Sequence, residues 1–168
     1  MNQRLAITFV VLGTLIISSC GGPSEQEQAN SEKEAVKTTV RGYYKALLAG
    51  EGARACALLS PAEAKAAGEW GTELDQVIGG AFGQKAGDPM DCVDEIESSA
   101  KSLKGYDGAK FIRSPKFQSV VVKGANALVT CCGGKIEPRL TKTNGKWLIS
   151  GGLYGDKLEK LRANTAGG

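Results

Sequence analysis

Apolar and polar positions follow different patterns in the two halves of the chain. Up to about residue 105, apolar residues recur every three to four positions, the spacing of one helix face. After that point, short runs rich in β-branched and aromatic residues are separated by breaks that contain glycine. Helices followed by a run of strands predict an α+β fold, with the helices packed on one face of an antiparallel sheet.

Four helices are expected in the first half, and three of them have clear end signals. Ser31 and Glu34 fit a capping box at the start of the first helix, and Gly50 is a suitable stop. Ser60 precedes a proline at the first position of the third helix, which we expect to end at Gly68. The expected helical ranges are 31–50, 53–59, 61–68 and 88–105.

The second half predicts an antiparallel meander of at least four strands. Asn144 and Gly145 form a strong hairpin signal, because both positions of a tight hairpin turn need a positive φ. Pro138 cannot donate a ladder hydrogen bond and indicates an edge or a bulge. A helical turn is expected at 156–163. The expected strand ranges are 110–113, 117–123, 127–132, 135–142 and 146–151.

The N-terminus has the features of a secretion signal. Arg4 precedes an apolar run at 5–17, which as a helix would span roughly 20 Å, short of the roughly 30 Å hydrocarbon core of a bilayer. The ending Ile17-Ser18-Ser19-Cys20 resembles the lipobox of bacterial lipoproteins. This resemblance implies lipidation of the Cys20 thiol, cleavage before Cys20 and anchoring of the protein at the extracytoplasmic face of the cell membrane.

These features predict one folded domain behind a lipid anchor. Residues 21–32 are rich in Gly, Pro, Ser, Gln and Glu and lack apolar periodicity, as flexible tethers do. The expected divisions are a signal peptide at 1–19, a lipidated flexible tether at 20–32, the domain at 33–163 and a frayed tail at 164–168.

Composition excludes several kinds of function. The 168 residues contain no histidine, which removes histidine acid–base chemistry and most zinc sites. The 21 basic and 18 acidic residues are scattered, so we expect no nucleic-acid partner. No glycine motif fits a phosphate loop and the cysteines lack C-x₂-C spacing, so we expect neither a cofactor nor a metal.

Three segments of the chain resemble one family. They are the opening helix with the short helix that carries Cys56, the later helix that carries Cys92, and the closing strands with their Asn-Gly hairpin and Trp147. Together they resemble nuclear transport factor 2-like (cystatin-like α+β) lipoproteins of the actinobacterial type, over residues 33–153. The resemblance implies a curved sheet wrapped over helices into a cone with an apolar cavity at its mouth. Candidate lining residues are Tyr43, Tyr44, Trp70, Phe117 and Trp147.

Apart from Cys20, four cysteines remain, and they allow three pairings. The resembled lipoproteins often carry one cysteine in each of two helices, which favours a Cys56–Cys92 disulfide. Cys131 and Cys132 are neighbours in an expected strand, so one should be buried and the other exposed. A bond between these two, and crossed bonds to the other two, remain open.

The expected function is binding rather than catalysis. Some proteins of the resembled family are enzymes that move protons with an Asp, His or Tyr in the cavity, but no candidate pair here has a spacing that fixes one site. We therefore expect a non-catalytic module for a protein or a small apolar ligand. The alternative is a carrier or an isomerase- or dehydratase-like enzyme, which a buried carboxylate within hydrogen-bond reach of a tyrosine would favour. The candidate acids and tyrosines are Asp75, Asp107, Glu137, Tyr43, Tyr44, Tyr106 and Tyr154.

Overall fold

A computed structural model describes residues 24–83, 87–106, 109–134 and 136–166. The segment predicted as a signal peptide, 1–19, and the predicted lipidation residue Cys20 lie outside these residues. The predicted α+β class is confirmed, with an antiparallel sheet in the order β1-β2-β3-β4. No described helix is long and apolar enough to cross a membrane. The elements are α1 (Glu25–Ala49), α2 (Gly52–Cys56), α3 (Pro61–Ala81), α4 (Cys92–Leu103), α5 (Lys110–Arg113), β1 (Phe117–Lys123), β2 (Asn126–Cys131), the 3₁₀ turn η2 (Cys132–Gly134), β3 (Arg139–Thr143), β4 (Lys146–Gly151) and α6 (Gly155–Ala166).

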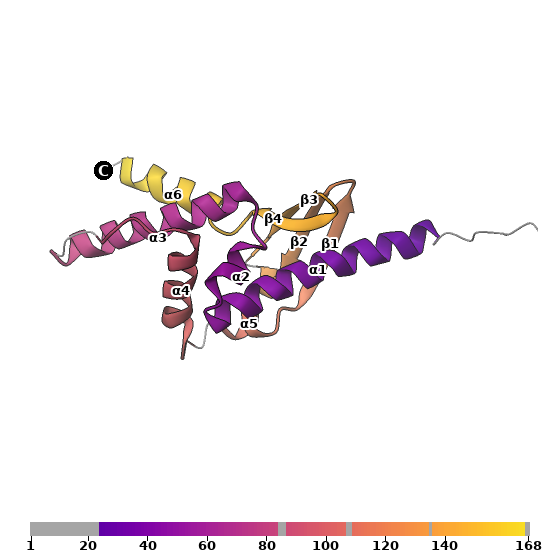
Figure 1. Cartoon of the computed structure of the whole chain (residues 1–168), viewed down its shortest axis with the longest axis horizontal. Coiled ribbons are helices and arrows are strands. Elements are labelled where there is room, and N and C mark those ends of the chain that lie inside the picture. Colours follow the sequence, from indigo (N-terminus) through magenta and orange to yellow (C-terminus); the bar gives the residue numbers. More distant parts are fainter. Residues whose placement is uncertain (1–23, 84–86, 107–108, 135, 167–168) are drawn as a thin grey trace, which may run out of the picture.

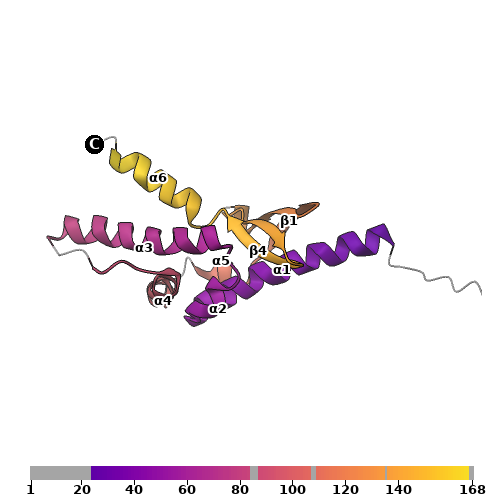
Figure 2. The same cartoon turned by 45° about the horizontal axis from the view of Figure 1, so that its top comes forward.

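The molecule is elongated, with two regions of different character (Figure 1). The sheet lies against α1 at one end, while α3, α4 and α6 extend towards the other end. Figure 2 shows α6 running beside α3, with α4 below. The N-terminal end of α1 and the C-terminal end of α3 therefore lie at opposite ends of the long axis.

The first helix begins about two turns earlier than its pattern predicts. The Ser24 side chain accepts a hydrogen bond from the Glu27 amide and the Glu27 carboxylate accepts one from the Ser24 amide, so the capping box lies here and not at Ser31. The prediction of a flexible tether is thus wrong for residues 25–32, which are helical. Glu32 fastens this extension to the sheet, because it pairs with Lys142 and accepts a hydrogen bond from Trp147 Nε1 at 2.8 Å.

The third helix continues well past its predicted end at Gly68. This glycine is buried, and a Cβ there would lie 2.6 Å from the Met90 carbonyl oxygen. Gly68 therefore serves close packing against the chain before α4 and does not stop the helix. The helix starts as predicted, with Ser60 accepting from the Glu63 amide and proline at the first position.

The four-stranded meander matches the prediction apart from two segments. Asn144 and Gly145 have φ values of 50° and 77°, as the hairpin turn requires. The range 110–113, predicted as a strand, is the short helix α5. Its helical turn places the Ile112 side chain in the core without any strand pairing. The strand predicted at 135–142 begins only at Arg139, after Pro138.

One sheet face is packed against helices and the other is largely open. The packed face contributes Val129, Leu140 and Ile149 to the core, all at most 1% exposed. On the opposite face, Val121 and Leu128 are 45% and 43% exposed. Within the described sheet, β1 is an edge strand paired with β2.

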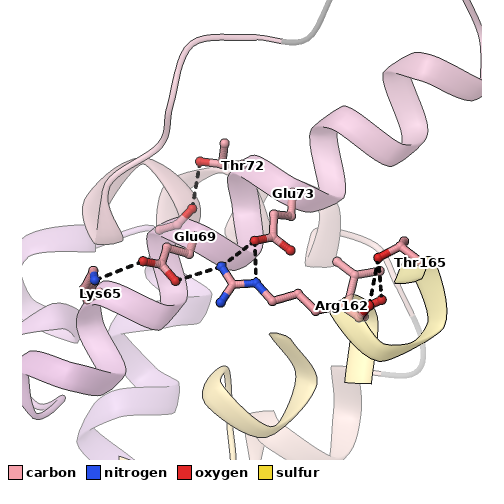
Figure 3. A network of polar contacts seen from close by, with 8 residues as sticks. Lys65, Glu69, Thr72, Glu73, Arg162 and Thr165 are labelled. Atoms are coloured by element: carbon pink, nitrogen blue, oxygen red, sulfur yellow. Dashed lines mark hydrogen bonds and ion pairs between the residues drawn. The ribbon is translucent and has the colours of Figure 1, made fainter. Parts of the chain in front are cut away.

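The helical end is held by a covalent bond and by surface ion pairs. Cys56 of α2 and Cys92 of α4 form a disulfide, the pairing favoured from the sequence, across a separation of 36 residues. The chain-entropy estimate for such a loop is roughly 3–4 kcal/mol of stabilisation. Arg162 of α6 bonds Glu69 and Glu73 of α3, as Figure 3 shows. These exposed pairs orient α6 more than they stabilise it.

The C-terminal helix is longer than predicted. α6 runs from Gly155 to Ala166, so the expected frayed tail at 164–168 is helical over its first three residues. Its start is anchored inside the molecule, because the amides of Leu153 and Tyr154 donate to Glu63. The fold therefore spans residues 24–166 within the described part of the chain.

Candidate functional site

The five side chains predicted to line a common cavity lie in separate surroundings. Tyr43 and Tyr44 of α1 are buried in the core, at 2% and 3% exposure, and Trp147 is buried against α1. Trp70 and Phe117 are only partly buried at the edge of the core. None of the five lines the pocket between α1 and the segment that follows α5.

That pocket lies between the C-terminal half of α1 and the segment from α5 to β1. It is an open hollow of about 770 Å³, within the usual range for ligand sites. Arg41, Lys45, Leu48 and Ala49 recur at helical spacing on α1 and form one wall. The other wall is the continuous segment 112–116. We call this hollow the basic pocket.

The basic pocket combines an apolar floor with a positive rim. Leu48, Ile112 and Pro115 supply the apolar surface. Among the described residues, its lining contains no acid, so the rim charges are uncompensated within the pocket. The rim cations are Arg41, Lys45, Arg113 and Lys116.

Only one rim cation has ion-pair or cation–π contacts among the described residues. Arg41 lies 3.9 Å from Glu34, at the outer limit of an ion pair, and its guanidinium sits 4.9 Å from the centre of the Phe117 ring. Stacking on Phe117 holds a planar, permanently charged group at the edge of the pocket. The arrangement favours a ligand that carries both negative charge and apolar surface.

A second polar cluster is fully buried where α1, α3, α4 and α6 meet. Glu63 is 3% exposed and accepts hydrogen bonds from the amides of Leu153 (3.2 Å) and Tyr154 (2.7 Å). The hydroxyls of Tyr43 and Tyr154 lie 2.8 Å apart. We call Tyr43, Glu63, Glu95 and Tyr154 the helical junction.

The titration behaviour of the helical junction follows from its burial. Burial raises the pKa of the Tyr43 and Tyr154 hydroxyls, so both stay neutral and can share a hydrogen bond. Burial also raises the pKa of Glu95, although the Ser99 hydroxyl and Lys157 act in the opposite direction. Glu63 accepts hydrogen bonds from two backbone amides, so it caps the start of α6.

The remaining cysteines do not point to opposite faces as predicted. Cys131 and Cys132 are 0% and 2% exposed, with Sγ atoms 2.7 Å apart. The prediction assumed a regular strand, but β2 ends at Cys131 and Cys132 has a left-handed φ of 61°. Burial and the neighbouring Cys132 raise the pKa of Cys131 to about 12. We call Tyr44, Cys131 and Cys132 the thiol corner.

The other candidate acids and tyrosines do not gather at one site. Tyr106 is 62% exposed, Glu137 is exposed, and Asp75 accepts a hydrogen bond from the Gly87 amide. Asp107 lies outside the described residues. Across residues 24–83, 87–106, 109–134 and 136–166, no three His, Cys, Asp or Glu side chains are placed to hold a metal ion.

The basic pocket was missed at the sequence level, although half of its signal is local. Arg41, Lys45 and Leu48 share a helix face, which the helical spacing alone reveals. The opposite wall comes from residues more than sixty positions later, and only the fold brings the two together.

No protein-family model, curated protein or solved structure matches this chain.

Proposed function

We propose that this protein is a membrane-anchored extracytoplasmic binding module that holds an amphiphilic anion in the basic pocket. The ligand class is a small molecule with an alkyl or acyl chain and a phosphate or carboxylate head. The single observation that carries the proposal is the rim of four cations around an apolar floor, with no acid in the described lining. Arginine forks suit phosphate and carboxylate oxygens, and the floor accepts the chain.

Two features support binding over catalysis. The buried carboxylate of Glu63 accepts hydrogen bonds from backbone amides, and that of Glu95 accepts one from the Ser99 hydroxyl. The described lining of the basic pocket offers charge and apolar surface but no acid that could act as a base.

The order of helices followed by a four-stranded meander supports a nuclear transport factor 2-like architecture as the finer description of the α+β fold.

A calorimetric titration tests the ligand class directly. Decyl phosphate, below its micelle concentration, is compared with decyl maltoside, which has the chain without charge, and with inorganic phosphate, which has charge without the chain. We expect measurable binding of decyl phosphate only, weakening as salt rises because the rim is exposed. Equal binding of decyl maltoside would contradict a site that selects for charge.

Charge-reversal variants locate the site. Arg113→Glu should weaken decyl phosphate binding by about tenfold or more, since one attraction becomes a repulsion at short range. Lys146→Glu is the matched control, because Lys146 is an exposed cation outside the basic pocket. An equal loss in both variants would mean that net charge, not the pocket, attracts the anion.

The membrane anchor needs its own experiment. Cys20→Ala removes the thiol that would carry the lipid. We expect the variant to leave the membrane fraction or to accumulate as an unprocessed precursor. A processed Cys20→Ala protein that stays with the membrane would overturn the anchor and leave the pocket proposal standing.

A further inference from the structure

The two thiols of the thiol corner face each other rather than opposite sides of a strand. Their Sγ atoms are 2.7 Å apart, which is shorter than an ordinary contact between sulfurs. In a regular strand, neighbouring side chains point to opposite faces. Here β2 ends at Cys131, and the φ of 61° at Cys132 turns the second thiol towards the first.

This backbone conformation is costly for a residue with a side chain. A non-glycine residue is disfavoured in the left-handed region, because its Cβ crowds the following carbonyl oxygen. Gly133 and Gly134 continue the same turn with φ values of 76° and 74°, without that cost. Glycine at position 132 would also make the turn, so the turn alone does not explain a cysteine there.

A buried polar group is also directed at the pair. Tyr44 is 3% exposed, and its hydroxyl has no hydrogen-bond partner among the described nitrogen and oxygen atoms. The same hydroxyl lies close enough to both sulfurs for each to influence the pKa of Tyr44. The Tyr44 hydroxyl is therefore a buried hydrogen-bond donor beside two sulfurs. Buried polar groups usually have a partner, so a phenylalanine would fill this place without leaving a polar group there.

We propose that Cys131 and Cys132 are a thiol–disulfide site, which closes into a vicinal disulfide by exchange with an external disulfide of the glutathione type. The Cys56–Cys92 disulfide fits a chain that folds under oxidising conditions, where such a partner is present. This inference does not depend on what binds in the basic pocket.

The reaction balances without a further reagent. The Cys132 thiolate attacks one sulfur of the external disulfide, which forms a mixed disulfide and releases one thiolate that takes up a proton. The Cys131 thiolate then attacks the Cys132 sulfur and releases the second thiol. Two cysteine thiols are oxidised, and one external disulfide is reduced to two thiols.

Burial sets when the reaction takes place. Because both thiols are buried and the pKa of Cys131 is raised, little thiolate is present in the folded chain. We therefore expect closure while the chain folds, and slow exchange afterwards. The exposed glycines of η2, Gly133 and Gly134, offer the route by which the folded corner could open.

Oxidative refolding with peptide mapping tests the proposal. The fully reduced chain is refolded in reduced and oxidised glutathione, then denatured, alkylated and digested with trypsin without reduction. Cleavage after Lys123 and Lys135 leaves both cysteines on one peptide, 124–135. We expect this peptide without alkyl groups and lighter than its dithiol form by two hydrogens. Two alkyl groups on it, together with an intact Cys56–Cys92 disulfide, would overturn the proposal.

Single-cysteine variants check the route. Cys131→Ser keeps the attacking Cys132 thiol but lacks the thiol that would displace glutathione, so it should retain glutathione as a mixed disulfide after refolding. Cys132→Ser lacks the attacking thiol, so its peptide 124–135 should retain little glutathione. The double variant should retain none. A Cys131→Ser variant whose Cys132 emerges as a free, fully alkylated thiol would contradict the exchange mechanism, even if an oxidised wild-type peptide were found.

Discussion

Two adjacent tyrosines of α1, Tyr43 and Tyr44, lie in buried regions that differ in how they treat the tyrosine hydroxyl. Tyr43 faces the helical junction, where its hydroxyl is bonded to that of Tyr154 at 2.8 Å. Tyr44 faces the thiol corner, where its hydroxyl lacks a nitrogen or oxygen partner among the described residues. The two rings pack edge to face, with their centroids 5.4 Å apart. The two tyrosines are equally buried but differ in role. The Tyr43 hydroxyl shares a hydrogen bond with another hydroxyl, whereas the Tyr44 hydroxyl lies beside two sulfurs.

The largest effect is expected at the cap of the helical junction. Glu63→Leu removes the acceptor of two buried amides, those of Leu153 and Tyr154. Leaving buried donors unpaired should lower the free energy of unfolding by about 3 kcal/mol, measured by urea denaturation. Glu63→Gln keeps one acceptor oxygen and should lose clearly less. Equal stability of Glu63→Leu and wild type would show that the junction does not depend on this cap.

The tyrosine pair should give the next largest loss. Tyr43→Phe or Tyr154→Phe alone leaves the other buried hydroxyl unpaired and should cost about 1–2 kcal/mol. The double variant should cost less than the sum of the two singles, because it removes both polar groups together. Strict additivity in this double-mutant cycle would contradict a direct hydrogen bond.

Glu95 should make stability depend on pH with a defined sign. Burial raises its pKa in the folded state, so the unfolded chain releases the proton first as pH rises. Its contribution to stability is thus greatest below the usual range of a glutamate and decreases as pH rises through the folded pKa. At each pH, the melting temperature of Glu95→Gln is compared with that of wild type. We expect the variant to gain more at pH 7 than at pH 4. A gain that is the same at both pH values would argue against this titration.

The smallest effect separates the two tyrosines most clearly. Tyr44→Phe removes a hydroxyl that has no nitrogen or oxygen partner, so stability should change by only about 0.5 kcal/mol or less, and a gain is acceptable. Tyr43→Phe, at the neighbouring position, is its matched control. A loss at Tyr44 as large as that at Tyr43 would place a structural hydrogen bond in the thiol corner.

Local signals in the sequence predicted the elements better than their ends. The Asn144-Gly145 hairpin and the cap at Ser60 act through neighbouring residues, and both were confirmed. Gly68 was misjudged because its reason is a close approach by Met90, a contact between distant segments. The helical extension before Ser31 was missed because it lacks apolar periodicity and is fastened by Glu32 to the sheet.

The same limit applies to the candidate site. The aromatic residues chosen as a cavity lining are buried or lie at the edge of the core, as large apolar residues usually do. The direction of the Cys132 side chain depends on its left-handed φ, which no pattern of residue types shows. The basic pocket joins one helix face to a segment far along the chain, so its positive rim exists only in the folded protein.

The most direct test of the proposed binding function is a map of where an amphiphilic anion binds. Amide chemical shifts of the isotope-labelled protein are followed by NMR as decyl phosphate is added. We expect saturable shifts at the α1 lining residues Arg41, Lys45, Leu48 and Ala49 and over residues 112–116. The amides of Glu63, Glu95 and Tyr154, and those of the open sheet face around Val121 and Leu128, should stay unmoved. Shifts centred on that sheet face, or no saturable shifts at all, would contradict the account.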